Sequence, residues 1–119
     1  MKLVSLVVPV YNEEEMLPIF FKKIEELFHD DDNYHYEFLL INDGSKDKTL
    51  DIIKEEAQKN DRLSYISFSR NYSQECAVEA GLRSAKGDVV IPLDCDFQDP
   101  PEVVFVLLLL WYLMFYLLI

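Results

Sequence analysis

The sequence predicts an α/β fold in which a mostly parallel sheet alternates with helices. Four apolar segments have the composition of buried strands, at residues 3–10, 36–42, 63–68 and 89–93. Stretches with helical spacing separate them, and this alternation predicts parallel strands joined by right-handed crossovers. Acidic and hydrogen-bonding residues directly follow three of these strands. Because open α/β sheets bind ligands at the carboxyl ends of their strands, a ligand site is expected at that edge.

The first two helices are predicted from their caps and apolar faces. The first is expected over 13–28, with Asn12 as its N-cap and Glu15 completing a capping box. The second is expected over 48–59, with Asp47 as its cap. The apolar stripe of the first helix consists of Leu17, Phe20, Phe21, Ile24, Leu27 and Phe28. These side chains are predicted to belong to the core.

A third helix is expected after Ser73, with one face of small residues. That face consists of Ala77, Ala80, Gly81, Ser84 and Ala85. Small side chains let a helix lie close to a sheet, so this face is predicted to contact the strands. Gly87 follows and is predicted to end the helix as a left-handed C-cap. The strand at 89–93 comes next.

The strongest functional signal directly follows this fourth strand. Residues 94–101 read Asp-Cys-Asp-Phe-Gln-Asp-Pro-Pro and place the oxygen ligands Asp94, Asp96 and Gln98 at alternate positions. Alternate residues of an extended segment point to the same side. Hard divalent cations such as Mg2+ take oxygen ligands and share them with phosphate oxygens. An acidic loop that merely faces water is the weaker alternative, because such a loop has no need to end a buried strand.

The charge balance narrows the range of partners. The chain has 22 acidic and 11 basic residues and a net charge of −11. Nucleic-acid binding needs a basic surface, so a nucleic-acid partner is not expected. The acidic chain would also repel the negative charge of a phosphate-bearing ligand. A divalent cation that bridges the two is therefore expected. The two cysteines, Cys76 and Cys95, have no metal-ligand spacing and fit a reducing, cytosolic environment.

Four short motifs follow the predicted strands in order. They read Val-Pro-Val-Tyr-Asn-Glu-Glu at 8–14, Asn-Asp-Gly-Ser-Lys-Asp at 42–47, Ser-Arg-Asn at 69–71, and the acidic motif at 94–101. Together they resemble the family 2 glycosyltransferases of GT-A fold, over about residues 3–102. The branch that they resemble acts on polyprenyl phosphates and includes dolichyl-phosphate mannose synthases and bactoprenol glucosyltransferases.

This resemblance implies an activity and its partners. The chain is expected to bind a UDP- or GDP-sugar with Mg2+ or Mn2+. The parent enzyme is expected to transfer a hexose to a polyprenyl phosphate at the cytoplasmic face of the membrane. Family members are considerably longer, so the chain is expected to hold only the nucleotide-sugar-binding part of the GT-A domain. A catalytically inactive remnant, anchored to a membrane or partner by its tail, stays open as an alternative.

The resemblance also implies roles for individual residues. Catalysis is assigned to Asp94 and Asp96, and metal binding to Asp94, Asp96 and Gln98. Asp43 is expected to accept a hydrogen bond from an N–H of uracil or guanine. Nucleotide contacts are assigned to Pro9, Tyr11, Glu13, Ile41, Asp43, Arg70, Asp94 and Cys95.

Three of these assignments have structural alternatives. Glu13 could instead be a first-turn acid that favours a helix dipole. Arg70 could pair with one of the many acids rather than with the diphosphate. Although Cys95 lies inside the nucleotide-binding motif, its side chain is expected to turn away and serve in packing.

Residues 103–119 form an apolar tail without a charged side chain. As a helix, these 17 residues would span about 25 Å, short of a hydrocarbon core of about 30 Å. Two interpretations are open, a segment that inserts into a membrane and the accidental product of a frameshift or truncation. The abrupt change after Glu102 favours a truncated product. The sequence thus divides into a nucleotide-sugar-binding part, 1–102, and a hydrophobic tail, 103–119.

Overall fold

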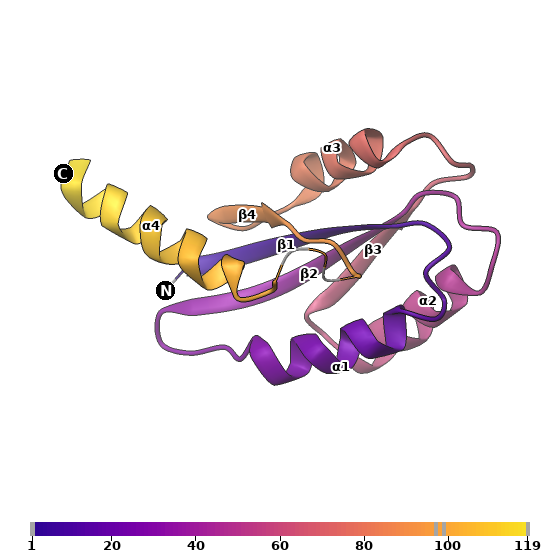
Figure 1. The fold of residues 1–119 in the computed structure, drawn as a ribbon, viewed down its shortest axis with the longest axis horizontal. Coiled ribbons are helices and arrows are strands. Elements are labelled where there is room, and N and C mark those ends of the chain that lie inside the picture. Colours follow the sequence, from indigo (N-terminus) through magenta and orange to yellow (C-terminus); the bar gives the residue numbers. More distant parts are fainter. Residues whose placement is uncertain (1, 97, 99, 119) are drawn as a thin grey trace.

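Four parallel strands form a sheet with helices on both faces (Figure 1). The computed structural model describes residues 2–96, 98 and 100–118. The strand order is β3-β2-β1-β4, and each neighbouring pair is parallel. This arrangement confirms the α/β fold and strand direction predicted from the sequence. The elements are β1 (Lys2–Val10), α1 (Leu17–Leu27), β2 (Tyr34–Asn42), α2 (Thr49–Lys59), β3 (Leu63–Ser67), α3 (Gln74–Ser84), β4 (Val89–Pro92) and α4 (Val103–Leu118).

The core is divided between the two faces of the sheet. Helices α1 and α2 cover one face and α3 covers the other (Figure 1). On β1, alternate residues such as Leu6 and Val8 join the α1 and α2 side, where Phe20 and Ile53 are buried. Val7, between them, faces α3 instead. This alternation follows from the two-residue period of a strand. Because the strands are parallel, their carboxyl ends, and the motifs that follow them, meet at one edge of the sheet.

Helix α1 begins at Leu17, not at residue 13, so the predicted capping box is wrong. The backbone of Asn12 has a positive φ of 52°, a conformation that asparagine tolerates better than most residues. The Asn12 carboxamide oxygen accepts a hydrogen bond from the Lys46 backbone N–H at 2.8 Å. No side-chain cap bond forms at Met16, the residue before α1. Residues 12–16 therefore serve the loop contacts described below.

The small-residue face of α3 lies against the sheet as predicted, except at Ser84, which is exposed. A Cβ atom at Gly81 would lie 2.2 Å from Cγ1 of Val7, a distance that excludes any larger residue. The predicted role of Gly87 is wrong, because α3 ends at Ser84 and Ala85 continues in an extended conformation. Gly87 is needed for a different reason: a Cβ there would lie 2.5 Å from Oγ of Ser5.

Replacement of Gly87 by alanine should therefore destabilise the fold. The new methyl group would push β4 away from β1, and overpacking of this kind costs about 1–3 kcal/mol. Urea denaturation of the two proteins measures this free energy of unfolding. Lys86→Ala is the control, since its side chain is exposed and its removal should cost less than about 0.5 kcal/mol. Equal stability of Gly87→Ala and the parent chain would contradict the close contact with Ser5.

Helix α4 is attached to the core by its first half. Val104 and Leu108 are buried, and the ring of Phe105 stacks on Phe28 with a centroid distance of 5.3 Å. The second half extends beyond the sheet (Figure 1). It carries exposed apolar side chains such as Leu113. Within the described residues, no helix combines the length and the apolar character that crossing a membrane requires.

Candidate nucleotide-binding site

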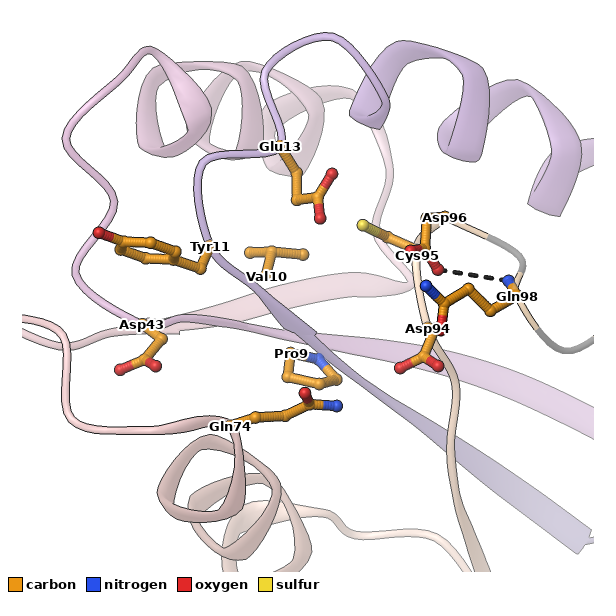
Figure 2. A pocket seen from close by; sticks show the side chains of 10 residues that line it. All are labelled: Pro9, Val10, Tyr11, Glu13, Asp43, Gln74, Asp94, Cys95, Asp96 and Gln98. Carbon is orange, nitrogen blue, oxygen red and sulfur yellow. Dashed lines mark hydrogen bonds between the residues drawn. The ribbon is translucent and has the colours of Figure 1, made fainter.

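A pocket of about 190 Å³ opens at the carboxyl ends of β1, β2 and β4 (Figure 2). Four carboxylates and two carboxamides contribute to its wall, so the pocket is strongly polar and acidic. Figure 2 shows Asp43 and Tyr11 at one end, and Asp94, Asp96 and Gln98 clustered at the other. The lining residues are Pro9, Val10, Tyr11, Glu13, Asp43, Gln74, Asp94, Cys95, Asp96 and Gln98.

Most of the residues selected from the sequence line this pocket, but Ile41 and Arg70 do not. Ile41 is fully buried in the core beneath α3. The guanidinium carbon of Arg70 lies 4.8 Å from the ring centre of Tyr72, so this side chain stacks on an aromatic ring. Val10 and Gln74 line the pocket and were not selected. Gln74 begins a helix at the same edge of the sheet, which is the signal that could have identified it.

The first two motifs are joined by hydrogen bonds between the loops at 11–15 and 43–49. These bonds fix the backbone that carries Tyr11 and Glu13 into the pocket, although the two loops lie more than 30 residues apart in sequence. The donors and acceptors are Asn12 N to Ser45 Oγ (2.9 Å), Glu13 N to Thr49 Oγ1 (2.8 Å), Glu14 N to Asp47 Oδ2 (3.3 Å), Lys46 N to Asn12 Oδ1 (2.8 Å) and Lys48 N to Glu14 Oε2 (3.2 Å).

Asp47 has a double role in this arrangement. Its Oδ1 accepts a hydrogen bond from the Thr49 backbone N–H at 2.9 Å, but the N-cap of α2 is Lys48, one residue later than the predicted cap. Its Oδ2 accepts from Glu14. Although burial opposes the shift, hydrogen bonds from Thr49 and Glu14 hold the pKa of Asp47 below its ordinary value. The carboxylate therefore stays ionised and keeps both loops in place at neutral pH.

Asp43 joins the second motif to the third. Asp43 is 4% exposed, and its carboxylate accepts hydrogen bonds from the Tyr72 backbone N–H at 2.8 Å and from Nδ2 of Asn71 at 3.0 Å. Gly44, at a φ of +69°, lies against the backbone of Arg70, where a Cβ would approach to 2.1 Å. Asp43 thus anchors the loop before α3. Each carboxylate oxygen can accept a second hydrogen bond, so this anchoring leaves Asp43 able to bind a ligand.

The acidic motif presents its oxygen atoms to the opposite end of the pocket. Asp94 and Asp96 are half-buried and Gln98 is exposed. Oδ1 of Asp96 accepts a hydrogen bond from the Gln98 backbone N–H at 3.3 Å (Figure 2). Phe97 and Asp99, two further members of the motif, lie outside the described residues. In the part of the chain that is described, no three histidine, cysteine or acidic side chains are grouped closely enough to hold a metal ion.

The electrostatics of Glu13 favour a cation at this end of the pocket. Desolvation by burial raises the pKa of Glu13, and repulsion from Asp96 and Asp47 raises it further. A divalent cation would relieve that repulsion. The donor set of Asp94, Asp96 and Gln98 consists of hard oxygen atoms, which suit Mg2+ or Mn2+. Glu13 also lies four residues before α1, so its interpretation as a first-turn acid is wrong.

Cys95 connects the first motif to the fourth. Its side chain is buried but points toward Glu13 in Figure 2, so the expectation that it turns away from the pocket is wrong. Hydrogen bonding by the thiol opposes the increase in the pKa of Glu13. Burial, followed by repulsion from Glu13, Asp96 and Asp94, raises the pKa of Cys95 to about 12. In the free protein the thiol therefore stays protonated at neutral pH.

Fold and pocket together define a parallel α/β domain whose ligand site is built by four interlocked motifs at one sheet edge. The sequence model of "Glycosyl transferase family 2" matches residues 5–112. The chain belongs to this family, and its identification from the four motifs is confirmed. The match also includes the first half of α4, where Val104 and Leu108 enter the core.

Curated relatives share up to half of the aligned residues. The prophage bactoprenol glucosyl transferase homolog of Escherichia coli K12 is 50% identical over 101 residues, which are 85% of this chain and 33% of that protein. The undecaprenyl-phosphate 4-deoxy-4-formamido-L-arabinose transferase of Aeromonas hydrophila is 44% identical over 102 residues, 85% of this chain and 31% of that protein. The chain thus spans about one third of the length of these relatives.

Solved structures confirm the GT-A fold. A mannosyltransferase from Pyrobaculum calidifontis, in complex with GDP-Man and Mn2+, has a TM-score of 0.70 at 22% identity, and the match covers 83% of this chain and 33% of that one. S. aureus TarS in complex with UDP has a TM-score of 0.69 at 25% identity, with 81% of this chain and 28% of that one covered.

Proposed function

We propose that this chain is the nucleotide-sugar-binding part of a hexosyltransferase that uses a polyprenyl phosphate as acceptor. The observation on which the proposal depends is the two-ended pocket, with Asp43 and Tyr11 at one end and Asp96 and Gln98 at the other. This arrangement suits a UDP- or GDP-sugar, which has a base at one end and a diphosphate at the other. The names of the bactoprenol and undecaprenyl-phosphate relatives support the choice of acceptor.

Each end of the pocket has its own task in the proposed reaction. Asp43 accepts a hydrogen bond from the base, while Pro9 and Tyr11 form the wall against which the base lies. Asp96 and Gln98, with Asp94, would hold Mg2+ or Mn2+, which as a Lewis acid stabilises the nucleoside diphosphate that leaves the sugar. The phosphate oxygen of the acceptor is already anionic near neutral pH. The protein therefore needs to position the reactants rather than supply a strong general base.

We also propose that the protein works at the cytoplasmic face of a membrane. A polyprenyl phosphate is a membrane lipid, so its phosphate must be reached at the membrane surface. The exposed apolar side chains of α4, among them Val106 and Leu110, supply a surface that lipid could cover. Flotation of the protein with lipid vesicles tests this association, and a protein that stays at the bottom of the gradient would contradict it.

Binding of the nucleotide should depend on the metal. Calorimetric titration of the chain with UDP-glucose and GDP-mannose should show binding of one of them in Mn2+, because the cation offsets the repulsion between the diphosphate and the carboxylates. In excess EDTA the affinity should fall at least about tenfold, since one lost charge-assisted contact costs roughly 1.5–3 kcal/mol. Equal affinity in EDTA would exclude the role of the metal, and failure to bind either donor would exclude the proposed function.

Transfer itself requires a separate assay. Labelled sugar from the donor that binds is followed into a polyprenyl phosphate in detergent. Turnover would establish that the chain is an active transferase. Binding without turnover would favour the alternative, in which the chain binds the nucleotide sugar but is catalytically inactive.

A further inference from the structure

Gln74 is a pocket residue to which neither the four motifs nor the comparisons give a role. It is the first residue of α3 and lines the same pocket as Asp43 and Asp94. Figure 2 shows its side chain extending from the start of α3 toward the end of the pocket where Asp94 lies. Among the residues that the structure describes, its carboxamide has no hydrogen-bond partner, and the residue is exposed. The amide is therefore available to a ligand.

The backbone that carries Gln74 is held from both sides. Before it, the Tyr72 backbone N–H donates to Oδ1 of Asp43 at 2.8 Å. After it, Oγ of Ser73 accepts a hydrogen bond from the Cys76 backbone N–H at 3.1 Å and caps α3. The side chain thus emerges from a fixed point on the pocket wall. Because the backbone is already held, ligand binding would have to order only the side chain of Gln74.

The chemistry of the pocket determines what Gln74 can bind. Glu13, Asp43, Asp94 and Asp96 are acceptors when ionised, whereas a carboxamide both donates and accepts. The part of a nucleotide that lies between base and diphosphate is the ribose. Its neighbouring hydroxyl groups need a donor as well as an acceptor, and Gln74 with Asp94 can supply both.

We infer that Gln74 binds the ribose hydroxyls of the nucleotide and so favours ribonucleotides at this site. The inference rests on the proposed function, because it takes the base to lie at Asp43 and the diphosphate at Asp96. It adds a specificity-determining residue that distinguishes a ribose from a sugar without these hydroxyls.

The test compares two ligands with three proteins. UDP and 2′,3′-dideoxyuridine diphosphate, or the matching guanosine pair if the chain prefers GDP, are titrated in Mn2+ into the chain, Gln74→Ala and Gln58→Ala. Gln58 is an exposed glutamine of α2 and provides the matched control. Gln74→Ala should weaken the ribonucleotide about 3- to 10-fold, the effect of one lost hydrogen bond. It should leave the affinity for the dideoxy analogue unchanged, and Gln58→Ala should change neither.

Two results would overturn the inference. An equal loss of affinity for both ligands in Gln74→Ala, or no loss for either, would show that the amide does not bind the ribose hydroxyls, while the proposed function would stand. If the unchanged chain bound neither UDP nor GDP, the proposed function and the inference would fail together. Circular dichroism of Gln74→Ala checks that α3 remains folded.

Discussion

Replacement of Asp96 by alanine is expected to abolish metal-dependent nucleotide binding. Asp96 is half-buried at the end of the pocket opposite Asp43, and its carboxylate is part of the proposed cation site with Gln98. Loss of even an outer-shell partner of a metal commonly reduces metal affinity about 10- to 100-fold, so loss of a ligand should have at least this effect. Calorimetric titration with the nucleotide in Mn2+ measures it.

The same substitution should act in the opposite direction without metal. In EDTA, the loss of one negative charge beside the diphosphate should strengthen weak binding of the nucleotide rather than reduce it. Asp61→Ala is the control, because it removes one exposed carboxylate near the start of β3. If Asp61→Ala and Asp96→Ala reduced the nucleotide affinity in Mn2+ to a similar extent, the loss would not depend on the position of Asp96. That result would contradict the cation site.

Replacement of Leu108 by glutamine is expected to cost much more stability than replacement of Leu109. Leu108 is 3% exposed and packs with the core, whereas its neighbour Leu109 is 57% exposed. Leu108→Gln removes buried apolar surface and buries an unpaired amide, for a cost of about 2–5 kcal/mol. Leu109→Gln should change the free energy of unfolding by less than about 0.5 kcal/mol. Urea denaturation measures both.

Leu109→Gln should also make the protein more soluble, because it reduces an exposed apolar surface. Comparison of the stabilities of the two variants tests whether α4 packs against the core of the domain. If 103–119 were an accidental appendage without tertiary contacts, both substitutions would have the same small effect on stability. That outcome would contradict the packing of α4 against Phe28.

The fold class was predictable because buried parallel strands have a distinct composition. Since their carboxyl ends meet at one edge, the motifs that follow them had to converge, and most of the selected residues do line one pocket. The start of α1 was not predictable from local capping patterns. The backbone N–H groups of Asn12 and Glu13 donate to Ser45 and Thr49, and partners so distant along the chain are invisible to a local rule.

The errors at single residues have the same physical origin. Gly87 was interpreted from its place after a helix, yet the constraint on it comes from Ser5, 82 residues away. Ile41 stands near Asp43 in sequence but belongs to the core beneath α3. Gln74 was not predicted as a pocket residue because the site was inferred from residues that follow strands. Gln74 instead begins a helix at the same edge of the sheet. The order of helices and strands could be predicted from the sequence. The contacts between side chains that are distant along the chain could not, and these contacts determine the roles of the residues that were predicted wrongly.

The pocket is proposed to bind a nucleoside diphosphate through a divalent cation. The most direct measurement is a crystal structure with UDP or GDP and Mn2+, recorded at a wavelength where manganese scatters anomalously. We predict a manganese peak within direct coordination distance of Asp96 and Gln98, bridged to the diphosphate, with the base at Asp43. A nucleotide bound away from these residues, or bound in the pocket without manganese, would contradict the claim.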